Sequence, residues 1–115
     1  MKVHRWSEIP VEQLNALLSR QVVHSERTTL ARLTLKKGAV VPRHQHENEQ
    51  ITTLERGRLR FVFEDREVIV ETGDSLQIPS NVPHLVEALE DSLALDLFAP
   101  VREDWLRGDD AYLRR

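Results

Sequence analysis

The stretch GAVVPRHQHENEQITTLERG, residues 38–57, places two histidines one residue apart and a glutamine four residues after the second. These residues are His44, His46 and Gln50. Side chains alternate between the two faces of a strand, so an extended segment would present all three on one face, together with Thr52. Two imidazoles on one face can converge on a metal ion. Such pairs also occur on exposed strands that bind nothing, so the spacing alone leaves both interpretations open.

A third histidine follows in GDSLQIPSNVPH, residues 73–84. A Gly-Asp turn leads into a short strand, and Pro79, Asn81 and Pro83 then fold the chain over to His84. The next strand would turn His84 inward in a small barrel. Three neutral imidazoles and one amide oxygen form a credible ligand set for one divalent first-row metal, such as Ni, Zn, Mn, Fe or Cu, with positions left for water or substrate.

Short strands dominate the chain from residue 28 onward. Alternating segments are separated by Gly, Pro, Asn and Asp at intervals of about eight to twelve residues. The predicted strands are residues 28–35, 51–54, 58–63, 67–71, 75–79, 84–89 and 92–98. This pattern predicts an all-β fold, either an antiparallel sandwich or a small barrel that is closed to hide its edges.

The two ends of the chain have a different pattern. Apolar residues recur at three- and four-residue steps near the N-terminus. They are Val11, Leu14, Leu17 and Leu18. With Pro10 in a first turn, this spacing predicts a short helix over residues 10–20, followed by a barrel over residues 22–99. Residues 100–115 mix charge with Trp105 and are interpreted as a packed extension or a single helical turn.

The composition indicates a single domain of ordinary globular character, residues 1–115. A formal net charge of -3 and scattered Lys and Arg residues give no sign of nucleic-acid binding. Cysteine is absent, which excludes disulfides and thiolate ligands. No apolar run approaches the roughly 20 residues of a membrane span, so a cytoplasmic protein is expected. A short barrel with an apolar sheet face to cover is also expected to form a homodimer.

Two spaced motifs carry a resemblance to a known family. Gly38-x5-His44-x-His46-x3-Gln50-x6-Gly57 is followed, after about fifteen residues, by Gly73-x5-Pro79-x-Asn81-x2-His84. The pair resembles the two conserved motifs of the cupin superfamily, which implies that family's antiparallel double-stranded β-helix, or jelly-roll barrel. The chain has Gln50, Asn81 and Ala88 where the family usually has Glu, Gly and Asn. Asn at position 81 is a mild change, because Asn tolerates the left-handed conformation that Gly supplies.

Within the superfamily, the chain resembles the small single-domain cupins related to the pectin degradation protein KdgF. The resemblance rests on RQVVHSERTTLARLTLKKGAVVPRHQHENEQI, residues 20–51, and on DLFAPVREDWL, residues 96–106. Such proteins open the ring of 4,5-unsaturated uronates, left by pectin or alginate lyases, to give the linear keto form. The resemblance therefore implies a metal-dependent isomerase. It puts the family's functional Asp, Phe and Arg on Asp96, Phe98 and Arg102.

The residues themselves give those three positions a partial rationale. Asp96 and Phe98 alternate with leucines in SLALDLF, residues 92–98, and share one face of the predicted strand. If that face points into the barrel, Asp96 would be a partly buried carboxyl with a raised pKa, suited to proton transfer. Phe98 would wall the pocket, and Arg102 would pair with a substrate carboxylate. The alternative is a solvent-facing Asp96 and an Arg102 that forms a surface pair with one of the two acidic residues after it.

Gln50 also bears on the chemistry. An amide in place of a carboxylate leaves a divalent ion with its full formal charge, which favours an anionic substrate and Lewis-acid chemistry. Two other classes stay open on the sequence. One is a cupin dioxygenase or lyase that acts on another small molecule with the same ligands. The other is a non-catalytic sugar- or effector-binding cupin, which would need no proton-transfer group.

Overall fold

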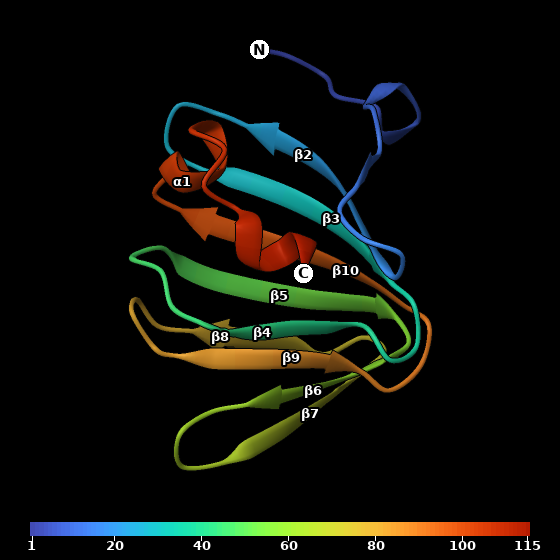
Figure 1. Ribbon diagram of the computed structural model, residues 1–115. Helices are drawn as coiled ribbons and strands as arrows, with labels where there is room; N and C mark the ends of the chain where they lie inside the picture. Colours follow the sequence, from blue (N-terminus) through green and yellow to red (C-terminus); the bar gives the residue numbers. More distant parts are fainter.

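Two antiparallel sheets make up most of the computed structural model, which describes residues 1–115 (Figure 1). The larger sheet has the strand order β1 (Glu12–Gln13), β2 (Leu18–His24), β3 (Thr29–Leu35), β10 (Ser92–Ala99), β5 (Glu49–Arg56) and β8 (Ser75–Ile78). The smaller sheet has the order β4 (Val40–His44), β9 (His84–Ala88), β6 (Arg58–Val62) and β7 (Glu67–Glu71). Between β3 and β10 the chain passes repeatedly from one sheet to the other. The predicted all-β barrel is confirmed.

Alternation along the strands determines which side chains enter the space between the sheets. Every strand predicted from alternation is present, and inward positions are apolar at most sites. In β3, for example, Ala31, Leu33 and Leu35 are buried, and Leu54 and Phe61 meet them from β5 and β6. Several polar exceptions gather at one end of the barrel. Among the buried polar residues, the group at this end includes His46, Gln50, Thr52, His84 and Arg102, whereas others such as Arg20, Ser92 and Asp110 lie elsewhere.

Gly57 makes the tight turn between β5 and β6 possible. Its φ angle is +103°, and a Cβ at this position would lie 2.6 Å from the carbonyl oxygen of Asp91. A side chain would therefore be strained by both the backbone conformation and the lack of space. Asn81 has a φ of 61°, so it adopts the left-handed conformation expected from its place in the second motif.

The predicted helix over residues 10–20 is wrong. This segment forms β1, a turn, and the start of β2, while the only helical turn before it is a 3-10 turn, η1 (Trp6–Glu8). Leu14 and Leu18 are buried as a helix would require, but Val11 is 62% exposed. A short isolated helix is marginal in water, whereas β2 pairs with β3 along its whole length and covers an otherwise open sheet edge. The barrel sheet accordingly begins before residue 22.

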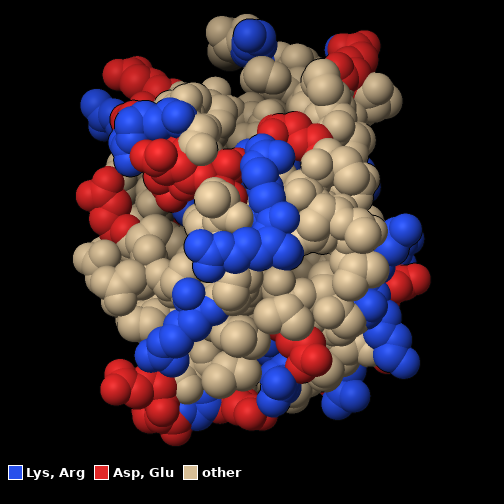
Figure 2. All heavy atoms as spheres, in the orientation of Figure 1, with Lys and Arg blue, Asp and Glu red and all other residues tan.

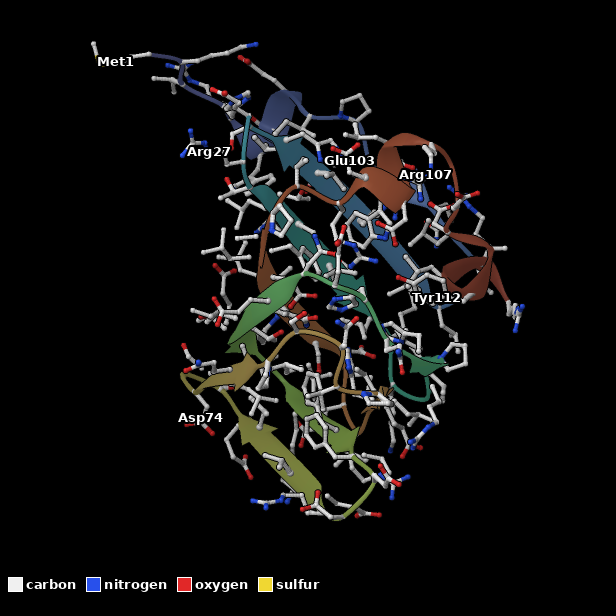
Figure 3. The ribbon with its side chains drawn as sticks, turned by 90° about the vertical axis from the view of Figure 1, so that its left-hand side faces the viewer. Met1, Arg27, Asp74, Glu103, Arg107 and Tyr112 are labelled. Atoms are coloured by element: carbon white, nitrogen blue, oxygen red, sulfur yellow. The ribbon has the colours of Figure 1, made fainter.

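The C-terminal residues form the packed extension that the sequence predicted. They contain α1 (Glu103–Leu106) and a 3-10 turn, η2 (Ala111–Arg114), and Trp105 and Leu113 are buried. Figure 3 shows this segment, labelled at Glu103, Arg107 and Tyr112, lying to one side of the strands. Its position closes the end of the barrel where the buried polar residues lie. None of the helices in the structure has the length and apolar character needed to cross a bilayer.

Acidic and basic side chains are interspersed over the face of the molecule drawn in Figure 2. Many of the surface charges are paired across strands, as in Arg58 with Glu71 at 3.2 Å and Arg60 with Glu87 at 2.9 Å. Exposed pairs of this kind contribute roughly 0–1 kcal/mol each. They do not mark a binding site.

Candidate metal centre

Three histidines from separate places in the sequence meet at one end of the barrel. His44 ends β4 and lies opposite His84, the first residue of β9, while His46 lies in the loop between β4 and β5. One ligand nitrogen from each imidazole can be chosen so that all three lie within 4.8 Å of one another. This is the spacing expected of side chains that bind a single ion.

The route by which they meet differs from the one expected. β4 ends at His44 and β5 begins at Glu49, so residues 44–54 are not one extended strand. His44 belongs to the smaller sheet and Gln50 to the larger one. The two side chains converge because the sheets face each other, and not because they share one face of a strand. The alternation argument holds only within β5, where Gln50 and Thr52 both point inward.

Backbone contacts fix the loop that carries His46. The N–H of Asn81 donates a hydrogen bond to the carbonyl oxygen of His46 at 2.8 Å, and the Ser80 hydroxyl donates to the carbonyl of Glu47 at 2.6 Å. The left-handed turn of the second motif thus holds the loop of the first. Glu47 and Glu49 are exposed to solvent.

Each imidazole is oriented by a backbone carbonyl two residues away in the sequence. The Nδ1-to-oxygen distances are 2.8 Å for His44 with Pro42, 3.0 Å for His46 with Asn48 and 2.8 Å for His84 with Val82. A carbonyl oxygen only accepts hydrogen bonds, so in the neutral ring the proton lies on Nδ1. Nε2 then carries a free lone pair, which is the state of a histidine prepared to bind a metal.

Burial lowers the pKa of all three histidines. The pKa of His44 falls to about 3, first through burial and then through the neighbouring His84. The pKa of His46 falls to about 4, again mainly through burial, with the positive charge of Arg102 as the next cause. The pKa of His84 is also lowered by its burial. All three rings are therefore neutral at pH 7, and neutral imidazole is the form that coordinates metals.

Gln50 lies beside the three histidines and provides a test of whether a cation fits. Its Oε1 lies 3.1 Å from Nε2 of His46, although its own NH2 group is directed to Thr52. A neutral His46 has one N–H for two acceptors, Gln50 Oε1 and the Asn48 carbonyl, so one of these contacts joins two lone pairs. A cation between Nε2 and Oε1 would satisfy both atoms. Ligand atoms about 3 Å apart also fit bonds of about 2.1 Å to a shared ion.

Asp96 lies on β10 directly opposite Thr52 of β5. Its carboxylate accepts a hydrogen bond from the Thr52 hydroxyl, with 2.6 Å between Oγ1 and Oδ1. Burial raises the pKa of Asp96 to about 6, although that hydrogen bond and the charge of Arg102 both act to lower it. Asp96 thus faces the interior, where a proton-transfer group would have to be. The role itself stays a prediction.

A hollow of about 40 Å³ lies between the sheets and is lined by His44, Gln50, His84, Asp96 and Phe98, among others. Such a volume holds an ion with a water molecule, and it is too small for a sugar ring. The aromatic ring of Phe98 forms part of the wall.

Arg102 also borders the hollow, but its side chain is engaged by the protein. It is 1% exposed, and its Nε and Nη2 donate to the two carboxylate oxygens of Asp104 at 3.0 and 2.7 Å. Its guanidinium carbon lies 4.6 Å from the ring centroid of Phe98 and 4.4 Å from that of Trp105. The pairing with an adjacent acid, considered as a surface contact, thus occurs in the interior. The expected contact with a substrate carboxylate is not tested by this arrangement.

The hollow is closed on its outer side by the C-terminal turn η2. The ring of Tyr112 stacks on that of His44, with 4.7 Å between centroids, and its hydroxyl accepts a hydrogen bond from Arg102 Nη2 at 2.8 Å. Tyr112 has no signal in the sequence, because nothing local connects it with the distant His44. Thr52 does have one, since it shares the parity of Gln50 on the same strand.

Comparison with known proteins identifies the family to which this fold belongs. A family model of the cupin domain matches residues 31–99, more than half of the chain. The chain belongs to the cupin family. A search of curated proteins found no match. The jelly-roll barrel and the site at one end of it are thus those of a small cupin, with three histidines as the candidate metal ligands.

Solved structures of other cupins superpose closely on this one. KdgF from Halomonas sp. has a TM-score of 0.81 at 29% identity, over 88% of this cupin and 96% of that chain. An RmlC-like cupin from Shewanella frigidimarina has a TM-score of 0.82 at 22% identity, over 89% and 93%. A predicted oxalate decarboxylase from Thermotoga maritima has a TM-score of 0.75 at 22% identity, over 86% and 99%. The latter two likenesses concern the fold alone.

Proposed function

We propose that this cupin is a metal-dependent isomerase that opens the ring of 4,5-unsaturated uronates to the linear keto form. The observation that carries the proposal is the meeting of three neutral histidines and Gln50 with Asp96, whose pKa is near 6, around one hollow. The likeness to KdgF supports the choice of substrate class.

The cofactor would be one divalent first-row transition metal, held by His44, His46, Gln50 and His84. Ni, Zn, Mn, Fe and Cu all suit such ligands. The bound ion would act as a Lewis acid that polarises a substrate oxygen. Because all four ligands are neutral, the site would keep a positive charge and would attract the carboxylate of a sugar acid.

Asp96 would supply the proton transfer. Opening the ring breaks the bond between the anomeric carbon and the ring oxygen, which leaves an aldehyde and an enol. The hemiacetal hydroxyl loses a proton in this step, and the enol becomes a ketone when a proton is added to the carbon at the far end of its double bond. A carboxyl group with a pKa of about 6 exists in both forms near neutral pH, so Asp96 can serve as acid or base. Atoms and charge balance without an oxidant or reductant.

Substrate entry would require movement of the C-terminal turn. The hollow measures about 40 Å³, and Tyr112 covers His44 on its outer side. A groove of about 230 Å³ also borders His46, and in its lining the acids Glu47, Glu103 and Asp104 outnumber the one base, Arg107, which disfavours an anion. If Tyr112 swings away, Arg102 loses one hydrogen-bond partner and gains a free donor for the substrate carboxylate. Phe98 would pack against the sugar.

A second candidate is a lyase or dioxygenase that acts on a smaller acid. The small volume of the hollow favours it, because a two- or three-carbon acid needs less displacement of Tyr112 than a uronate does. Oxygen consumption and metal analysis would separate this candidate from an isomerase. A non-catalytic binding protein would keep its role in an Asp96→Ala variant. The expected homodimer also stays a prediction, to be tested by the mass of the protein in solution.

The test uses protein loaded in turn with each candidate metal. A lyase-generated unsaturated uronate is added, and loss of the absorbance of its conjugated double bond is followed against the spontaneous rate. The proposal expects acceleration that disappears with a chelator and in the Asp96→Asn variant. If no metal form accelerates the reaction, the isomerase assignment is wrong. If Asp96→Asn retains full activity, the acid–base role of Asp96 is wrong.

A further inference from the structure

Two hydrogen bonds link a candidate metal ligand to Asp96 through Thr52. Gln50 Nε2 donates to Thr52 Oγ1 at 2.8 Å, and Thr52 Oγ1 donates to Asp96 Oδ1 at 2.6 Å. Gln50 and Thr52 follow each other on the inward face of β5, and Thr52 and Asp96 are directly opposed in the β5–β10 register. Gln50 is 4% exposed and Thr52 1% exposed, so bulk solvent does not compete for these hydrogen bonds.

The donor and the acceptor of each of these two hydrogen bonds follow from counting the available protons. Above its pKa of about 6, the carboxylate of Asp96 is ionised and only accepts, so the single proton of the Thr52 hydroxyl goes to Asp96. The oxygen of Thr52 must then accept, and only the NH2 end of the Gln50 amide can donate to it. The other end of the amide, Oε1, is thereby turned toward His46 and the metal centre.

We propose that Thr52 is a positioning residue for the metal centre, which holds the Gln50 amide with its oxygen toward the ion. Asp96 sets the direction of the Thr52 hydroxyl, and Thr52 sets the direction of the amide. The inference rests on the proposed metal centre but not on the proposed substrate. It concerns a residue that touches neither the ion nor the sugar acid.

The same two hydrogen bonds give a physical reason for glutamine at position 50. A glutamate there has no N–H to offer Thr52, and its carboxylate would face the lone pair of a hydroxyl whose proton is already given to Asp96. An amide satisfies both neighbours, because its NH2 group meets Thr52 and its oxygen meets the ion. Asp96 and Thr52 together therefore favour a residue that donates on one side and accepts on the other.

The experiment measures Ni²⁺ binding by isothermal titration calorimetry at pH 8, with the metal-free protein and two matched variants. Thr52→Val removes the hydroxyl while keeping the side-chain volume. Thr53→Val makes the same change one residue later on β5, where the hydroxyl contacts Ser75 on the outer face at 2.8 Å. We expect Thr52→Val to weaken Ni²⁺ binding roughly tenfold or more, since outer hydrogen-bond partners of metal ligands have effects of about 10- to 100-fold. Thr53→Val should stay within about twofold of the unmodified protein.

A second pair of variants tests the role of the hydroxyl even if Thr52→Val does not fold. Thr52→Ser and Thr52→Ala lack the same methyl group and differ only in the hydroxyl. Serine should bind Ni²⁺ within about threefold of the unmodified protein, and alanine should show the full loss. If serine and alanine bind equally, the hydroxyl is not the cause and the inference is overturned.

The outcomes separate this inference from the metal centre on which it rests. If the unmodified protein takes up no Ni²⁺, the metal centre and the role of Thr52 both fall. If it binds Ni²⁺ and Thr52→Val binds equally well, only the role of Thr52 falls. If Thr52→Val loses affinity and Thr52→Ser regains it, the inference is supported whether or not the protein acts on a uronate.

Discussion

Nε2 of His46 and Oε1 of Gln50 face each other at 3.1 Å, inside the barrel. His46 has its proton directed to the Asn48 carbonyl, and Gln50 has its NH2 group directed to Thr52, so neither atom at this contact has a proton to donate. Two buried lone pairs in contact are unfavourable in the metal-free protein. A divalent ion turns the same geometry into two bonds, and folding and metal binding should therefore be coupled.

The first prediction tests this coupling with His46→Ala. Saturating Ni²⁺ should raise the melting temperature of the unmodified protein, because a ligand at about 100 times its Kd stabilises the native state by about 2.7 kcal/mol. His46→Ala should show little or no rise and should retain below about a tenth of an equivalent of metal after dialysis. His4→Ala is the control, since His4 is exposed and remote from the site. An undiminished Ni²⁺-dependent rise in the alanine variant would rule out His46 as a ligand.

The second prediction concerns the pH dependence of stability caused by Asp96. The pKa of Asp96 is raised by burial from 3.8 to about 6, so between these values the unfolded chain releases a proton that the native state keeps. Stability is therefore lost as the pH rises through this window, by about 3 kcal/mol at most for a shift of about two pKa units. Asp96→Asn should remove this loss in the metal-free protein.

Chemical denaturation from pH 4 to pH 8 measures the effect. The free energy of unfolding of Asp96→Asn, relative to that of the unmodified protein, should increase from pH 4 to pH 7 and then level off. Comparing the two proteins at each pH cancels the shared contribution of the histidines. A difference that is constant across the range would mean that Asp96 titrates normally, and its suitability as an acid–base group would be lost.

The sequence predicted those strands whose alternating pattern lies within the segment itself, and it failed where a strand depends on its neighbours in the sheet. The strands from β5 to β10 follow from alternation that each segment carries by itself. β2 was missed because Leu14, Leu17 and Leu18 have helical spacing, whereas Leu14 packs from a turn and Leu18 from a strand. The deciding factor was the open edge of β3, which is a property of the sheet and not of residues 10–20.

In the candidate site, too, some residues could be predicted from local sequence motifs and others could not. The two motifs contain His44, His46 and His84 at fixed spacings, so their meeting was predictable once a barrel was assumed. Arg102 was assigned to the substrate carboxylate by the family resemblance, and the alternative was a surface pair with one of the two acidic residues after it. The pair with Asp104 does form, but in the interior, and no sequence pattern connects it with the rings of Phe98 and Trp105 that cover the guanidinium. Contacts between the tail and β4 lie outside sequence reasoning for the same reason.

The third prediction treats Tyr112 as the barrier between the hollow and solvent. Tyr112→Ala should speed the removal of bound Ni²⁺ by a chelator, by roughly tenfold, because the ring no longer covers His44. It should also destabilise the fold by about 1–3 kcal/mol, since Arg102 loses a buried partner. Tyr112→Phe keeps the stacked ring and loses only the hydroxyl, so it should lower stability without an equal gain in rate. Identical chelation rates in all three proteins would show that the ion leaves by another route.

The last prediction concerns Gln50→Glu, which changes the charge next to the ion with hardly any change in volume. A carboxylate attracts a divalent ion more strongly than an amide does, so affinity for Ni²⁺ should rise or hold, even though Thr52 loses the N–H that it accepts. The same negative charge reduces the positive charge that the site presents to an anionic substrate. Binding of a sugar acid should weaken, and turnover should fall by roughly tenfold or more if that charge controls one contact in the transition state.

The measurement for Gln50→Glu pairs metal content with turnover of an unsaturated uronate, in the variant and in the unmodified protein. Reporting both values separates a loss of the ion from a loss of its Lewis acidity, because only the second leaves the metal content full. Gln50→Asn is the control, since it keeps the amide but is one methylene too short to reach from β5 to both Thr52 and the ion. It should lose metal, whereas glutamate should not. A glutamate variant that holds a full equivalent of metal and turns over as fast as the unmodified protein would show that the neutral ligand at position 50 has no part in the reaction.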